Sequence, residues 1–82
     1  MGYLLKELHY VDKVMDYGVT VSILKARNKI LGWVEPYPQS TAVDEEKGKY
    51  FYSVGNPNKQ RLTQYTVDTL DEGKEALKRI FL

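Results

Sequence analysis

The chain has 82 residues, of which 43% are hydrophobic and 28% charged, and it carries a formal net charge of +1 and no cysteine. Such a composition indicates one small folded domain over residues 1–82 and not a disordered tail. No stretch approaches the roughly 18 consecutive apolar residues of a membrane span, and a signal-peptide pattern is missing. We therefore expect a cytoplasmic protein without a membrane partner, and the lack of cysteine excludes disulfides, thiolate metal sites and cysteine nucleophiles.

The first predicted element is a helix over residues 3–16. Its apolar residues recur at the spacing of an amphipathic helix: Leu4, Leu8, Val11 and Met15. Gly18 would end this helix. The β-forming residues between His9 and Val11 would also suit a strand, so the spacing favours a helix without excluding the alternative.

The next two predicted elements form a hairpin. Residues 19–24 alternate apolar and polar side chains, which predicts a strand with one apolar face: Val19, Val21 and Ile23. A turn over residues 26–29, with Asn28 suited to positive φ, leads into a second strand over residues 30–35, which Pro36 ends.

A second hairpin is predicted after a long connection. The connection covers residues 36–48, which is long for so small a domain, and long ordered loops often carry function. A third strand over residues 49–54 follows, then a turn at residues 55–58 and a fourth strand over residues 61–67.

The last predicted element is a C-terminal helix. Thr69 and Glu72 have the spacing of a capping box, which predicts that the helix begins between them. The apolar stripe has helical spacing and comprises Leu70, Gly73, Leu77 and Ile80, flanked by Ala76 and Phe81. A glycine inside a helix costs about 1 kcal/mol relative to alanine, so Gly73 indicates a helix backbone that lies close to the sheet.

These elements together predict an α+β fold. It consists of a small antiparallel four-stranded sheet made of two hairpins, with the C-terminal helix packed on one face and the N-terminal helix beside it.

Enzymatic chemistry has little support in the sequence. His9 is the only imidazole, and a hydrolytic site needs a convergent nucleophile, base and orienting group. Glycine motifs that cradle phosphate and carboxylate spacings that bind calcium are also missing. We therefore expect a non-enzymatic protein with no catalytic residue, no metal site and no cofactor.

Aromatic residues are the most informative feature, because the chain has seven tyrosines and one tryptophan. Two helices can cover one face of a four-stranded sheet, while the strands carry apolar residues on both faces. We therefore expect an exposed aromatic face that, with the 36–48 loop, binds a protein partner of unknown identity, as a small inhibitor or adaptor from a phage or mobile element would. Its expected anchors are aromatic, as interface anchors usually are: Trp33, Tyr37, Tyr50 and Tyr52. A loop folded over this face, or self-association through it, would cover it equally well.

The alternative function is binding of DNA or RNA. Cations interleave with tyrosines along the predicted strands, as they do in proteins that stack single-stranded bases. The expected nucleic-acid contacts are Lys25, Arg27, Lys29, Lys49 and Arg61. A pI of 7.9 is low for such a protein, which keeps this function second.

Overall fold

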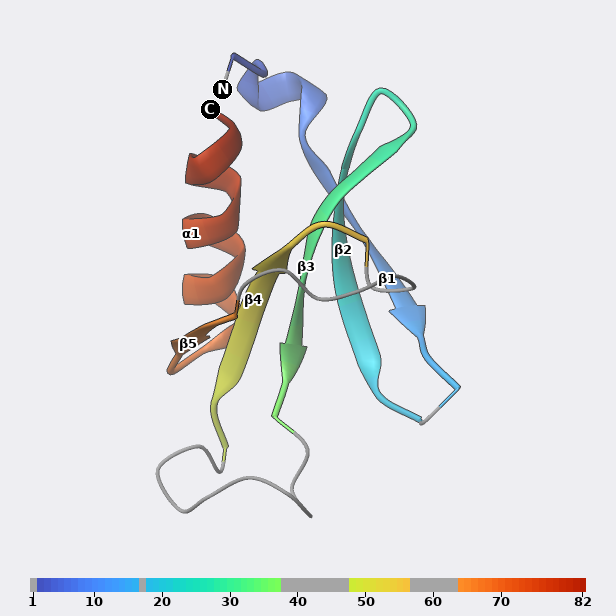
Figure 1. The fold of residues 1–82 in the computed structure, drawn as a ribbon, viewed down its shortest axis with the longest axis vertical. Helices are drawn as coiled ribbons and strands as arrows, with labels where there is room; N and C mark the ends of the chain where they lie inside the picture. The colour runs from blue at the N-terminus through green and yellow to red at the C-terminus, as the bar shows by residue number, and fades with distance from the viewer. Residues whose placement is uncertain (1, 17, 38–47, 57–63) are drawn as a thin grey trace.

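The computed structural model describes residues 2–16, 18–37, 48–56 and 64–82 (Figure 1). Within these residues the fold is a five-stranded antiparallel sheet in the order β1-β2-β3-β4-β5, followed by one α-helix. A short 3₁₀ helix, Leu5–Glu7, comes before the sheet. The other elements are β1 His9–Val14, β2 Thr20–Ala26, β3 Lys29–Pro36, β4 Tyr50–Val54, β5 Tyr65–Val67 and α1 Leu70–Phe81. The α+β class with an antiparallel sheet is confirmed, but the sheet has five strands and not four.

The prediction of an N-terminal helix is wrong, because this segment forms the edge strand β1. Its six residues pair with β2 in a continuous antiparallel register, from His9 opposite Lys25 to Val14 opposite Thr20. The apolar residues of this segment fit both periods, and the β-forming side chains gain a partner strand only in the tertiary structure. Of the four residues in the predicted helical stripe only Leu8 is buried.

The first predicted hairpin is confirmed. Arg27 and Asn28 form the turn between β2 and β3 with φ angles of 52° and 64°, the left-handed pair that a tight hairpin turn requires. The second hairpin is also present, since β4 pairs with β5. Strand β5 begins at Tyr65, and residues 61–63 of the predicted strand lie outside the described residues.

The C-terminal helix begins where the capping pattern predicts. Thr69 is the N-cap residue, and its Oγ1 accepts a hydrogen bond from the Glu72 amide at 3.1 Å. Gly73 is buried, and a Cβ built on it would lie 2.7 Å from Cγ1 of Val34. The helix backbone therefore lies directly on β3, as expected from a glycine in this position. Ile80 of the predicted stripe is 39% exposed, while Phe81 packs against the core.

Strands β2 and β3 are buried on both faces of the sheet. Helix α1 covers one face over β3, β4 and β5 (Figure 1), and the core on that side includes Leu24, Val34 and Leu77. On the opposite face, Val21, Ile23 and Trp33 form a second buried cluster. Trp33, an expected anchor of an open aromatic face, therefore lies in a buried cluster. No helix among the described residues is long and apolar enough to cross a membrane.

Candidate functional site

The four predicted aromatic anchors lie on different faces of the sheet. Trp33 is 2% exposed and Tyr37 is 8% exposed, both on the face opposite α1. Trp33 Nε1 donates a 2.8 Å hydrogen bond to Oε1 of Glu35, which is also buried. An indole whose only polar atom already has a buried partner is a core residue, so Trp33 does not offer a contact surface.

Tyr37 belongs to the same buried layer. Its ring centroid lies 5.0 Å from that of Phe51, and its hydroxyl makes a 2.6 Å hydrogen bond with Oγ1 of Thr66. The side-chain amide of Gln64 donates to the same hydroxyl at 2.7 Å. Tyr37 therefore ties β4 and β5 together just beyond the end of β3. Residues 38–47 of the predicted binding loop lie outside the described residues.

Tyr50 and Tyr52 point toward the helix face. The register places Tyr52 opposite Val34, which lies against Gly73 of α1. Both tyrosines are half-buried and pack against the core under the helix. The Tyr52 ring stacks on that of Tyr65 with centroids 5.1 Å apart. The structure does not bring the four predicted anchors together on one surface.

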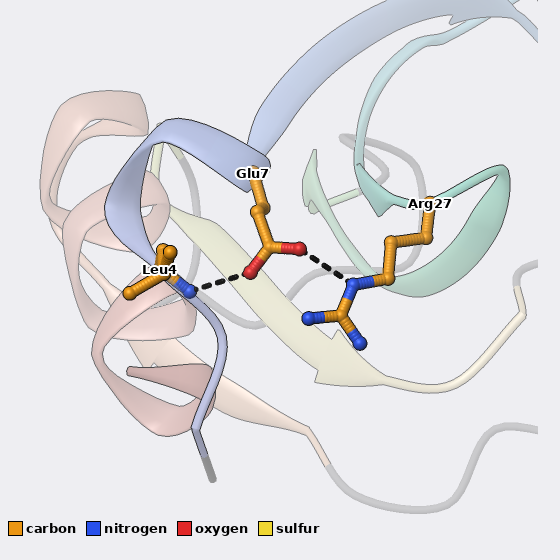
Figure 2. Close-up of polar contacts among 3 residues, drawn as sticks. All are labelled: Leu4, Glu7 and Arg27. Carbon is orange, nitrogen blue, oxygen red and sulfur yellow. Dashed lines mark hydrogen bonds and ion pairs between the residues drawn. The ribbon is translucent and has the colours of Figure 1, made fainter.

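The predicted basic residues are also divided. Arg27, at the tip of the β2–β3 hairpin, donates through Nε to the Glu7 carboxylate at 2.5 Å (Figure 2). Its guanidinium lies 5.0 Å from the Tyr3 ring centroid. The other Glu7 oxygen accepts from the Leu4 amide at 2.9 Å. These two hydrogen bonds, that of Arg27 above all, lower the pKa of Glu7 below its usual value. Arg27 thus joins the hairpin tip to the 3₁₀ helix.

Lys49 lies at the opposite end of the sheet. Its Nζ lies 3.5 Å from Oδ1 of Asp68, and its carbonyl oxygen accepts from the Tyr37 amide beyond the end of β3. The eight residues of β3 separate it from Lys29 by roughly 23 Å at 3.3 Å per residue. Lys25 and Lys29 remain near the hairpin tip with Arg27, while Arg61 lies outside the described residues. The predicted cations do not form a single patch.

Strand β1 has more exposed residues than any other strand in the described chain. This strand stands at one edge of the sheet, and five of its six residues are exposed. They include two valines, Val11 at 43% and Val14 at 68% exposed. The opposite edge strand, β5, has three residues and so offers fewer backbone groups than the six residues of β1. Sequence reasoning missed this edge because it assigned the segment to a helix, although its β-forming residues pointed to it.

The hydrogen-bonding groups that β1 presents outward follow from its register. Met15 donates its amide to the Val19 carbonyl at 2.9 Å, which extends the β1–β2 register by one hydrogen-bonded pair. In an antiparallel ladder such pairs alternate, so the backbone groups of Lys13 and Val11 face β2. Those of Tyr10, Asp12 and Val14 therefore point away from the sheet. Among the described residues, no strand pairs with this outer side.

A groove of about 410 Å³ lies beside β1 on the helix face. Asp12 and Ser22 share this face with Val34, and the groove extends from them to the first residue of α1, Leu70. Its polar walls are Asp12, Thr20, Ser22 and Tyr50, and its apolar walls include Pro36 and Leu70. Ser22 Oγ donates to Oδ1 of Asp12 at 2.9 Å and so orients this carboxylate. Asp12 has no cationic partner among the described side chains.

Tyr10 connects the same edge to the helix. Its hydroxyl donates to the Lys74 carbonyl at 2.7 Å, while the ammonium groups of Lys74 and Lys78 lie 5.2 and 5.9 Å from its ring centroid. Burial, and to a lesser degree the nearby Glu75 carboxylate, raises the pKa of the Tyr10 phenol well above its usual value. The phenol stays neutral and keeps its hydrogen bond, which links β1 to α1.

Comparison with protein-family models, with curated proteins and with solved structures found no match to this chain. In the described part of the chain, histidine, aspartate and glutamate side chains do not gather in a group that could hold a metal ion. Functional inference therefore rests on the geometry of β1 and its groove.

Proposed function

We propose that this protein is a non-enzymatic protein-interaction module that binds an extended segment of a partner protein along β1. The observation that carries this proposal is the exposed edge, where the backbone groups of Tyr10, Asp12 and Val14 face outward beside two exposed valines. An extended segment can add to such an edge as a further strand, with main-chain hydrogen bonds that give affinity and side chains that give specificity.

Charges along the edge favour a foreign strand over a second copy of the chain. Two copies related by a two-fold axis keep their helices on the same side, so residues of equal parity lie opposite each other. A register centred on Asp12 places this carboxylate opposite its own copy, which is destabilising. A register centred on Val11 places Asp12 opposite Tyr10 of the other copy, near Lys74 and Lys78, but it places Lys13 opposite His9 and leaves no basic residue opposite Asp12. A foreign strand can place a basic residue opposite Asp12 as well as an acidic residue opposite Tyr10.

The nucleic-acid alternative has weaker geometric support. Arg27 and Lys49 already have carboxylate partners, Glu7 and Asp68, and they lie at opposite ends of the sheet. Phosphate binding needs several cations that neutralise adjacent charges. The alternative remains an outcome of the experiment below.

The test uses ¹⁵N-labelled protein and a displayed library of random heptapeptides. We expect selected peptides rich in β-forming residues, and we expect them to slow hydrogen exchange at the outward amides of Tyr10, Asp12 and Val14. The inward amides of Val11 and Lys13 should change little, since they are already bonded to β2. A selected peptide that protects amides elsewhere, a dimer in solution that β1 holds together, or stronger binding of a single-stranded oligonucleotide would each contradict the proposal.

Two substitutions at one position provide a matched control. Asp12→Pro removes an outward amide and places a ring where a partner strand would lie, so binding of the selected peptides should weaken by tenfold or more, on the order of one lost hydrogen bond plus a clash. Asp12→Asn keeps the amide and should retain binding within about threefold, as expected for one exposed charge. Asp12→Asn should keep the thermal unfolding transition, because it retains the oxygen that accepts from Ser22. Asp12→Pro loses this hydrogen bond and should lower the stability by about 1 kcal/mol while keeping a cooperative transition, because the Asp12 amide takes no part in the β1–β2 ladder.

A further inference from the structure

The charges beside β1 indicate which strand it would accept. The side chains of Tyr10 and Asp12 lie on the same face of the sheet as α1, and their backbone groups point away from the sheet. The charges beside these two residues have opposite signs. The ammonium groups of Lys74 and Lys78 lie over the Tyr10 ring, whereas Asp12 is a carboxylate two residues further along the strand. Neither these lysines nor Asp12 form an ion pair with another described residue. A strand on this edge would meet both charges at once.

We infer that the bound segment is an antiparallel strand with a basic residue opposite Asp12 and an acidic residue opposite Tyr10. This inference rests on the proposed strand addition and deepens it. Directly opposite residues of an antiparallel pair lie on the same face with their Cβ atoms about 5 Å apart, so the basic side chain enters the groove beside β1. The acidic side chain lies next to Lys74 and Lys78.

The groove suits the side chain of lysine or arginine. Its apolar walls, including Pro36 and Leu70, can cover the methylene stem, while Asp12 and the hydroxyls of Thr20 and Tyr50 receive the charged end. Ser22 holds the carboxylate of Asp12 in a fixed orientation, so less side-chain freedom is lost when a cation binds there. A groove of about 410 Å³ has ample room for such a side chain.

Because the bound segment runs antiparallel to β1, the order of its residues along the chain can also be predicted. In an antiparallel pair, the residue opposite Val14 comes first in the bound segment, then the residue opposite Asp12, then the residue opposite Tyr10. The preferred pattern on this face is therefore apolar, basic, acidic at alternate positions. Reversing the two charges places like charges together at both positions.

The test compares two synthetic peptides of equal composition, acetyl-TVTKVET-amide and acetyl-TVTEVKT-amide, by titration of ¹⁵N-labelled protein. The first peptide should bind about tenfold more tightly than the second, since each position changes from an attractive to a repulsive cross-strand pair. The preference should shrink as salt rises, because these charges are partly exposed. Equal affinities, or tighter binding of the second peptide, would overturn the inference.

Variants separate the two charged positions. Asp12→Asn should reduce the preference to about threefold, and Lys74→Met together with Lys78→Met should do the same, since each removes one of the two charge contrasts. Lys13→Gln is the matched control: it removes a charge from the same strand, but its side chain lies on the other face opposite an uncharged peptide residue, so the preference should persist. An unchanged preference in Asp12→Asn would contradict the assignment of the basic residue to the groove.

Failure of this inference can be distinguished from failure of the proposed function. If selected library peptides protect the outward amides of β1 while the two synthetic peptides bind equally, strand addition stands and the charge pattern is wrong. If neither the library peptides nor the synthetic peptides protect those amides, both proposals are wrong.

Discussion

At the scale of single residues, Tyr10 shows how burial and charge fix a side chain. It is half-buried between β1 and α1, its hydroxyl bonds the Lys74 carbonyl, and two ammonium groups lie over its ring. The phenolate form would lose the hydrogen bond that the hydroxyl donates and would be poorly solvated. This is why burial raises the pKa of Tyr10.

The raised pKa of Tyr10 predicts a loss of stability in alkali. A group with a higher pKa in the folded than in the unfolded state stabilises the protein fully below the unfolded pKa, which for tyrosine is about 10. This contribution falls as the pH rises from about 10 toward the folded pKa. Urea unfolding between about pH 9 and pH 11.5 should therefore show a steeper fall for the natural protein than for Tyr10→Phe. Parallel curves for the two proteins would contradict the prediction.

The role of a single residue can be predicted from the sequence when the residues that it contacts are close to it in the chain. Thr69 and Glu72 are three residues apart, and their capping contact followed from the sequence alone. Trp33 offered no such signal. Its burial depends on Val21 and Ile23 from another strand and on a carboxylate two residues away. A large aromatic residue in a strand is equally consistent with a core and with a contact surface until the second layer is known.

At the scale of elements, the contact between α1 and β3 is set by glycines. A Cβ on Gly73 would lie 2.7 Å from Cγ1 of Val34 and 3.2 Å from Cγ2 of Val67, and one on Gly32 would lie 2.9 Å from Cδ1 of Leu77 in α1. Helix and sheet therefore approach more closely than side chains at these positions would permit. The glycine in the helix was visible in the sequence because it interrupts an otherwise favourable helical segment.

Gly73→Ala tests this packing. Helix propensity alone would stabilise the variant by about 1 kcal/mol, whereas overpacking against buried Val34 destabilises by about 1–3 kcal/mol. We expect a net loss of about 1 kcal/mol in the free energy of unfolding, measured in urea. Val34→Ala should be less harmful in the Gly73→Ala background than alone, because the smaller side chain relieves the contact. A more stable Gly73→Ala protein would show that the helix can move away from the sheet.

The edge strand β1 is the element that sequence periodicity assigned wrongly. Val11 and Met15 fit a helical stripe together with Leu4 and Leu8, but a helix there would leave β2 without an outer neighbour. Pairing with β2 gives all six residues a partner strand and satisfies the backbone groups of His9, Val11 and Lys13. The propensity and spacing of residues in a short segment do not reveal the stabilisation that strand pairing provides, because the partner strand is formed by residues that follow in the chain.

At the scale of the whole molecule, strands β2 and β3 form the central layer between two buried faces. Helix α1 lies on one of them, and Trp33 with its neighbours occupies the other. The chain ends lie together, where the Gly2 and Tyr3 amides donate to the carbonyls of Leu82 and Phe81 (Figure 1). The described aromatic residues Trp33 and Phe51 thus build the layers, while β1 is an exposed edge of the sheet.

Trp33→Ala tests whether this aromatic residue is structural. Removing a buried tryptophan typically costs about 3–5 kcal/mol, and a domain of this size is stabilised by about 4–12 kcal/mol. We therefore expect a large loss of unfolding free energy in urea and a weakened near-ultraviolet circular dichroism signal. Tyr65→Ala is the control, because Tyr65 is 48% exposed, and losing its stacking should cost only about 0.5–1.5 kcal/mol. A stable Trp33→Ala protein would restore Trp33 as a contact residue.

The sequence by itself determined the elements whose signals are local: the β2–β3 hairpin around Asn28, the strand β4, and the helix that begins after Thr69 and rests on the sheet at Gly73. Only the tertiary structure decided that residues 9–14 form an edge strand and that Trp33 lies in a second buried layer. The physical reason is that strand pairing and the covering of a sheet face join residues far apart in the chain, so their free energy has no signature within any short window of sequence.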